Sequence, residues 1–177
     1  MKIILSRITI VFSAAVLFSG CGSGSSVTLP SQQKTATVIF SASTTASLPA
    51  AVRIIKITAQ MPAGVTLPLV GSSKQVDSSS LTALKSGSTV FGRYSAPLLT
   101  LVVTGDMALS SPGLGLDNVR DFAKAQIFFP TGALLTESSF TSINNPFPEP
   151  FDVTGLSGTS SISLTGFLKR SPLKVTF

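Results

Sequence analysis

The sequence lacks histidine and tryptophan, contains one tyrosine, and has charged residues at only 11% of its 177 positions. Without histidine, the chain has neither the commonest general base nor the commonest metal ligand of proteins. No motif for an activated nucleophile is recognisable either. The shortage of tyrosine and tryptophan argues against a sugar-binding face built on stacking. These absences favour a non-catalytic protein that uses no cofactor.

The chain also has a single cysteine, Cys21, so no disulfide within the chain supports the fold. Two basic residues, Lys2 and Arg7, precede an apolar run over residues 8–18. This run is shorter than the roughly 20 residues that a membrane-spanning helix needs. A basic start, an apolar centre and small residues before a cleavage point are typical of a secretory signal, which is excluded from the fold.

The end of this signal, Leu17-Phe18-Ser19-Gly20-Cys21, resembles the lipobox of bacterial lipoproteins. One position departs from the family pattern, because Phe18 stands where the family prefers Leu. The resemblance implies cleavage between Gly20 and Cys21, a diacylglycerol on the Cys21 sulfur, and an acyl chain such as palmitate on its amine. The alternative is an ordinary thiol near a plain signal cleavage site.

Lipidation at Cys21 predicts a protein anchored in the bacterial cell envelope, because each buried methylene of an acyl chain contributes about 0.8 kcal/mol. Gly22 follows the cysteine. In enterobacterial lipoproteins an Asp at that position favours retention in the inner membrane, so its absence favours the outer membrane in a cell that has one. We therefore expect a signal peptide at 1–20, a lipidated Cys and flexible Gly/Ser-rich tether at 21–34, and a domain at 35–177.

Basic residues outnumber acidic ones by 13 to 7, and without the signal by 11 to 7, which gives a net charge of +4. The basic residues are scattered singly, as Lys56, Lys74, Lys85 and Lys124 illustrate. We interpret them as solvated surface, because a nucleic-acid site would need a cluster. The expected partners are a membrane, through the lipid on Cys21, and a protein or polysaccharide ligand.

The pattern of the remaining chain is that of β-strands, because apolar residues alternate with Ser, Thr and Lys. Val52 and Ile54 are out of phase with Ile55 and Ile57, which predicts a bulge near Ile54–Ile55. Turn signals recur every 8–12 residues or so, and they favour an all-β fold, an antiparallel β-sandwich of jelly-roll or Ig-like type, after the signal helix and tether. Strands are expected at residues 35–42, 52–61, 98–104, 122–129, 161–167 and 173–177, and a loop or short helical turn at 78–86.

Within residues 35–143, four segments resemble the cohesin-like domains of bacterial exported proteins. These segments are Leu48-Pro49-Ala50, Met61-Pro62-Ala63-Gly64-Val65-Thr66, the strand from Val119 to Phe129 that leads into Pro130-Thr131-Gly132, and Thr136-Glu137-Ser138-Ser139-Phe140. Such domains share a jelly-roll sandwich with certain carbohydrate-binding modules. The resemblance implies binding to a dockerin module or a polysaccharide, and no binding residue of the family maps onto this sequence.

Two groups of residues are candidate binding sites. Asp117 and Asp121 could supply oxygens to Ca²⁺, although capping of a turn is the alternative interpretation. Phe147 and Phe151 stand in a proline-rich bend at residues 144–150, whose stiff backbone could present both rings to a partner. The alternative there is that the two rings close the end of the core.

The sequence therefore predicts a lipid-anchored envelope protein whose β-sandwich is a non-catalytic binding or structural module. One alternative is an envelope hydrolase acting through a carboxylate pair. Such an enzyme, for example a glycosidase, needs two carboxyl groups that flank the bond to be cleaved. The other alternative is a structural lipoprotein of an envelope assembly. The acidic residues from which such a pair could come are Asp77, Asp106, Glu137, Glu149 and Asp152.

Overall fold

The computed structural model describes residues 33–105, 120–147 and 151–177. The chain divides into two compact units, Met1–Pro30 and Ser31–Phe177, and the described residues all belong to the second. The lipobox with Gly20 and Cys21, the tether up to residue 32, and Asp117 lie outside the described residues, so their interpretation stays a prediction. No helix in the described ranges is both long enough and apolar enough to cross a membrane.

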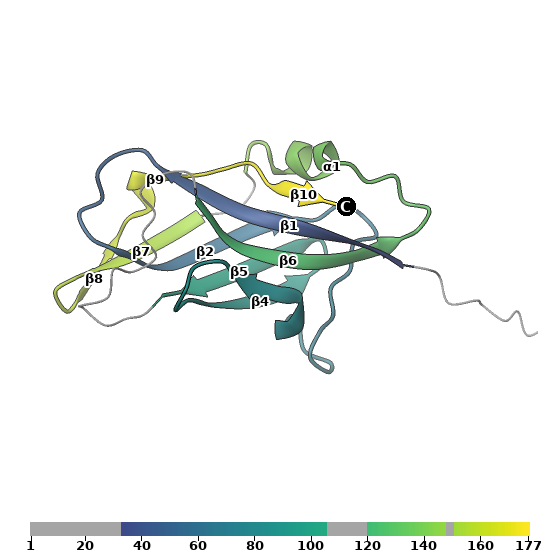
Figure 1. The fold of residues 1–177 in the computed structure, drawn as a ribbon, viewed down its shortest axis with the longest axis horizontal. Helices are drawn as coiled ribbons and strands as arrows, with labels where there is room; N and C mark the ends of the chain where they lie inside the picture. Colours follow the sequence, from purple (N-terminus) through teal and green to yellow (C-terminus); the bar gives the residue numbers. More distant parts are fainter. Residues whose placement is uncertain (1–32, 106–119, 148–150) are drawn as a thin grey trace, which may run out of the picture. The chain divides into compact units, whose positions relative to one another are not determined.

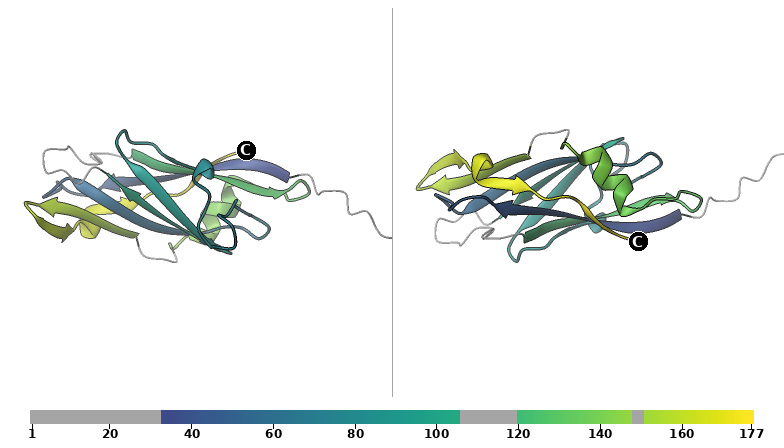
Figure 2. Two further views of the ribbon diagram at one scale, coloured as in Figure 1. Left: turned by 90° about the horizontal axis from the view of Figure 1, so that it is seen from below. Right: turned by 90° about the horizontal axis from the view of Figure 1, so that it is seen from above.

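The domain is a sandwich of two antiparallel sheets, which lie as two layers in Figures 1 and 2. One sheet has the order β10-β1-β6-β3, and β9 pairs with β1 at the end that β10 leaves free. Its strands are β1 (Gln33–Thr44), β3 (Leu81–Ala83), β6 (Arg120–Pro130), β9 (Leu168–Arg170) and β10 (Lys174–Thr176). The predicted all-β sandwich is confirmed.

The second sheet has the order β4-β5-β2-β7-β8. Its strands are β2 (Val52–Gln60), β4 (Thr89–Ser95), β5 (Leu98–Thr104), β7 (Phe151–Ser157) and β8 (Ser160–Ser163). Four short helical segments connect the strands: η1 (Ser78–Ser80), α1 (Glu137–Thr141), η2 (Ser142–Asn144) and η3 (Thr165–Phe167).

The core consists of the apolar residues that the period-two pattern assigned to one face of each long strand. In such a strand, alternate side chains point to the same face. The predicted inward positions are fully or almost fully buried, since none is more than 4% exposed. They are Ala36, Val38, Phe40 and Ala42 of β1, Ile55, Ile57 and Ala59 of β2, Leu99, Leu101 and Val103 of β5, and Ala123, Ala125, Ile127 and Phe129 of β6.

The structure contains two bulges, one of which the sequence predicted. The register between β2 and β7 shifts between Val52 and Ile54, which confirms the predicted bulge one residue earlier than expected. The register between β1 and β6 also shifts, so that Phe40 faces Ala123 while Ser41 faces Asp121. The extra residue of this second bulge is Phe122, whose side chain is buried.

Four short strands and one 3-10 helical turn differ from expectation. β4, β7 and β9 were not predicted, and the strand expected at 161–167 ends at Ser163 and continues into η3. The expected loop or turn at 78–86 is η1 followed by β3. These short elements owe their strand geometry to neighbours that the local pattern does not reveal.

A helical region, α1 with η2, connects β6 in one sheet to β7 in the other. Thr136 and Ser139 form a capping box at its start. Phe140 is fully buried, and its ring lies 6.4 Å from that of Phe177 after β10. Figure 2 shows α1 beside the C-terminal strand. This segment therefore covers one side of the sandwich and positions the residues described next.

Candidate functional site

The candidate site begins where β2 extends beyond its neighbour β7. Among the described residues, the pairing of the two strands runs from Val52 to Ile57, which lies opposite Phe151 at the start of β7. Asn144 of η2 takes the place of the missing strand: its Oδ1 accepts from the Gln60 N–H at 3.0 Å, and its Nδ2 donates to the Gln60 carbonyl at 3.0 Å. The same Nδ2 donates to the Phe140 carbonyl at 2.7 Å.

Arg170, at the end of β9, completes the same free edge. Its Nη1 donates to the Thr58 carbonyl at 2.6 Å, and its Nη2 donates to Asn144 Oδ1 at 3.4 Å. The residue is only 3% exposed, and its buried Nε has no hydrogen-bond partner among the described residues. The guanidinium is thus held in place by β2 and η2 while part of its donor capacity is unused.

The described groups that contact the Arg170 guanidinium are all neutral. Both of its hydrogen bonds go to amide oxygens, and its Cζ lies 4.3 Å from the centroid of the Phe147 ring. A cation over an aromatic face is attracted by the ring quadrupole, more strongly when water is excluded. Burial lowers the pKa of Arg170 to about 10. The guanidinium therefore stays charged at neutral pH and would gain from an anion beside it.

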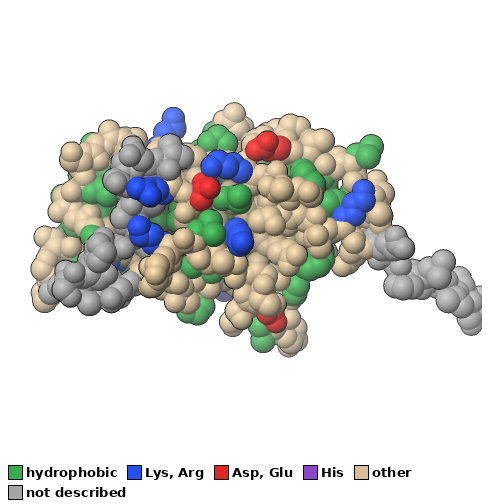
Figure 3. Space-filling view, in the orientation of Figure 1, with side chains coloured by type: hydrophobic (Ala, Val, Ile, Leu, Met, Phe, Trp, Pro, Cys, Tyr) green, Lys and Arg blue, Asp and Glu red, His purple; other side chains and the backbone are tan. Residues whose placement is uncertain are grey.

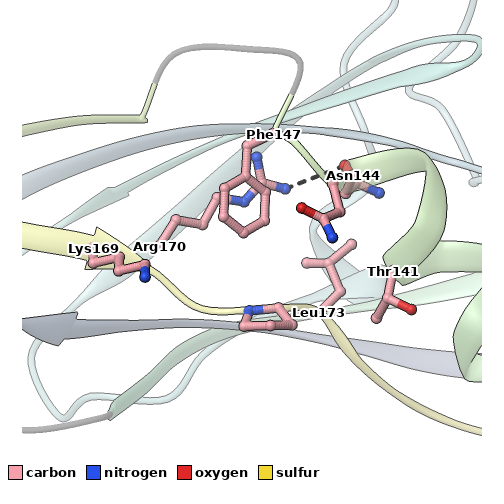
Figure 4. A pocket seen from close by; sticks show the side chains of 8 residues that line it. Thr141, Asn144, Phe147, Lys169, Arg170 and Leu173 are labelled. Carbon is pink, nitrogen blue, oxygen red and sulfur yellow. Dashed lines mark hydrogen bonds between the residues drawn. The ribbon is translucent and has the colours of Figure 1, made fainter.

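A pocket of about 250 Å³ lies beside this guanidinium (Figure 4). Phe147 and Asn144 border it on one side, and Leu173 gives it an apolar wall. The volume is below the 300–1,000 Å³ usual for a whole drug-sized ligand, so it fits a single group of a larger partner. Among the residues that the structure describes, the lining consists of Thr141, Asn144, Asn145, Phe147, Lys169, Arg170, Pro172 and Leu173, which include two cations and no acid.

The two phenylalanines of the proline-rich bend have different environments. Phe147 covers Arg170 and lines the pocket. Phe151 opens β7, is half-buried, and packs against the core. The structure therefore does not bring the two rings together as one surface, and only Phe147 belongs to the candidate site.

Asp121, the described half of the predicted calcium pair, is engaged by the protein itself. Its Oδ1 accepts from Ser41 Oγ at 2.8 Å and from Lys174 Nζ at 2.9 Å. The hydrogen bond from Lys174, followed by that from Ser41, lowers the pKa of this carboxyl below 3.8. Within the described ranges, His, Cys, Asp and Glu nowhere gather in groups of three or more that could hold a metal ion. With Asp117 undescribed, calcium binding stays a prediction.

The remaining described acids lie away from the pocket. Asp77 is the N-cap of η1, where its Oδ1 accepts from the Ser79 N–H at 2.8 Å, and that backbone hydrogen bond, with a side-chain one, lowers its pKa. Glu137 is in the first turn of α1, and Asp152 is an exposed residue of β7. Asp106 and Glu149 lie outside the described residues.

Sequence reasoning missed Asn144, Lys169 and Arg170. Its interpretation of the basic residues as solvated surface is wrong for Arg53 and Arg170, which are each 3% exposed. One signal could have identified Arg170: it has the same parity as the apolar Leu168, so a strand through both directs both side chains inward. Both are indeed buried while Lys169 between them is exposed.

Comparisons of this chain with protein-family models, with curated proteins and with solved structures gave no match. The argument for function therefore depends on the pocket and on the sequence.

Proposed function

We propose that this protein is a lipid-anchored, non-catalytic binding module of a bacterial cell envelope, and that its pocket at Arg170 holds an anionic group of a protein or polysaccharide partner. The observation that carries the proposal is the buried guanidinium beside an open pocket, with neutral hydrogen-bond partners and an unused Nε donor. A carboxylate is the simplest group that complements it.

The electrostatics of the pocket support this ligand class. Lys169 and Arg170 contribute two positive charges, and the other described lining residues are neutral. A buried arginine is a costly feature unless a counter-charge or several hydrogen bonds compensate it. Asn144 and Asn145 add amide groups that can orient a polar ligand, while Leu173 and Phe147 contact its apolar part.

The non-catalytic part of the proposal is supported by the roles of two described acids. Asp77 caps a helical turn and Asp121 is paired with Lys174, so each has a structural partner. The chain contains no histidine that could act as a general base.

The binding experiment uses a monocarboxylate sugar, glucuronate, with glucose as its neutral counterpart. We expect glucuronate to shift the backbone amide resonances of the non-proline residues among 144–147 and 169–173 in NMR spectra, and glucose to leave them unchanged. Arg170→Met should abolish the shifts. Arg93→Ala, which removes an exposed arginine of β4, is the matched control and should retain them. Equal shifts with both sugars, or shifts that persist in R170M, would contradict the proposal.

The anchor has a separate test. The mass of the mature protein from a membrane fraction should equal that of residues 21–177 plus a diacylglyceryl group and an acyl chain. Cys21→Ser should remove this modification. An unmodified protein that starts at another residue would disprove lipidation, and with it the outer-membrane location that Gly22 favours.

A further inference from the structure

A second hollow, here named the end groove, lies where β1 begins. It has a volume of about 610 Å³. Its rim includes Leu134, which is 95% exposed, and Phe177, which is 55% exposed. Figure 3 shows hydrophobic side chains near a basic one at this end of the sandwich. The lining residues are Gln33, Lys34, Thr35, Phe129, Ala133, Leu134, Leu135 and Phe177.

The apolar side chains of the end groove are held in place by the fold. The Phe177 ring packs edge-on against Phe129, with centroids 5.9 Å apart, and against Phe140. Leu134 follows a turn that the hydrogen bond from the Ala133 N–H to the Pro130 carbonyl closes at 2.9 Å. Leu134 adds nothing to the core, so its exposure has no structural explanation within the domain.

The chain that leads to the lipid starts at this groove. Gln33 and Lys34 line it, and Cys21 lies twelve residues before Gln33 in the sequence. Twelve residues span at most about 40 Å when fully extended. A lipid on Cys21 therefore keeps the groove within reach of the bilayer.

We infer that the end groove docks on the lipid surface, with Leu134 and Phe177 entering the interface between headgroups and acyl chains. The exposed Lys34 beside them complements anionic headgroups. Because the tether makes this contact intramolecular, a weak affinity suffices to populate it. The inference depends on the proposed lipidation of Cys21, and it sets the orientation of the domain on the membrane.

The test compares two spin labels on the lipidated protein in vesicles of phosphatidylethanolamine and phosphatidylglycerol. Leu134→Cys places a label in the groove, and Thr159→Cys places one in the exposed turn between β7 and β8, at the opposite end of the sandwich (Figures 1 and 2). The diacylglyceryl group proposed on the Cys21 sulfur occupies it as a thioether, so each introduced thiol is the single reactive one. Both sites are exposed, so neither change disturbs the core.

Accessibility to oxygen, which partitions into lipid, and to a water-soluble nickel chelate is measured for each label. We expect the ratio of oxygen to nickel accessibility to be several-fold higher for L134C than for T159C. The difference should shrink when Phe177→Ser is added or when phosphatidylglycerol is omitted. Equal ratios in protein that floats with the vesicles would overturn the docking inference and leave the anchor intact.

Flotation separates the other outcomes. Protein that does not float with the vesicles would overturn the anchor and the docking together. Dipolar coupling between L134C labels on two molecules, without a gain in oxygen accessibility, would show that a second copy occupies the groove and would also overturn the inference.

Discussion

At the scale of single residues, side chains replace a strand along the free edge of β2. Asn144 donates to and accepts from Gln60, which is the exchange that a neighbouring strand would make. Arg170 donates a hydrogen bond to the next carbonyl along this edge, that of Thr58. Because Arg170 also borders the pocket, the groups that complete the sheet are the groups that form the candidate site.

The first prediction concerns Asn144. Asn144→Ala should lower the free energy of unfolding by about 2–3 kcal/mol, because it leaves the N–H and carbonyl of Gln60 without their partner in a partly buried place. Asn145→Ala, at an exposed neighbouring position, is the matched control and should change the value by less than about 0.5 kcal/mol. Urea denaturation of both variants measures the difference, and equal stability would show that water replaces the amide.

The second prediction concerns Asp121 and pH. Its pKa is lowered in the folded state, so its ion pair stabilises the fold above pH 3.8, and this contribution is lost as pH falls through the folded-state pKa. Asp121→Asn should therefore cost about 0.5 kcal/mol at pH 7, a small value because the pair is partly exposed. The cost should vanish at the acid end of a series of urea denaturation curves. A cost that is independent of pH would contradict the ion-pair explanation.

At the scale of elements, the short strands fit only because small residues let them approach their neighbours. β7 carries Gly155 next to the bulge in β2. A Cβ at this position would lie 2.7 Å from Leu164 Cδ1 and 2.8 Å from the Ala51 carbonyl oxygen. The backbone oxygen cannot move away as a side chain can, so β7 requires glycine there.

The third prediction follows from this contact. Gly155→Ala should lower the free energy of unfolding by about 1–3 kcal/mol, the usual cost of forcing an extra carbon into a packed site. Gly166→Ala is the matched control, because nothing lies within 4 Å of its added Cβ. Thermal melts of the two variants make the comparison, and a stable G155A would mean that β7 can shift away from β2.

At the scale of the whole domain, both sheets contribute to one hydrophobic core. Tyr94 of β4 is one of the residues buried in this core. Its OH donates to the Val65 carbonyl at 2.7 Å, and burial raises its pKa. The pocket and the end groove lie on this shared framework, so a partner and a membrane surface could be engaged together.

The fourth prediction tests whether this framework unfolds as a unit. Tyr94 is the only tyrosine and the chain has no tryptophan, so its fluorescence reports on the second sheet alone. Urea transitions measured by this fluorescence and by far-ultraviolet circular dichroism should coincide, as expected for a domain with one core. Two separate midpoints would show that the sheets unfold independently.

Much of the fold could be predicted from local patterns, and the candidate site could not. Strands such as β5 and β6 place an apolar residue at every second position over most of their length, which is a strong signal. The strand β9 has three residues, too few for a pattern. Phe147 was predicted as a candidate, whereas Asn144 and Arg170 are polar residues whose burial follows from contacts with β2, which lies 84 to 112 positions away along the chain.

The sequence by itself determined the class of fold and the inward faces of the long strands, because burial of one face imposes a period of two. It also carries the prediction of a lipid at Cys21. The tertiary structure alone decided where β7 begins, and therefore which polar side chains complete β2. It also placed Leu134 and Phe177 at the start of β1. Those are consequences of contacts between distant segments, which no local pattern encodes.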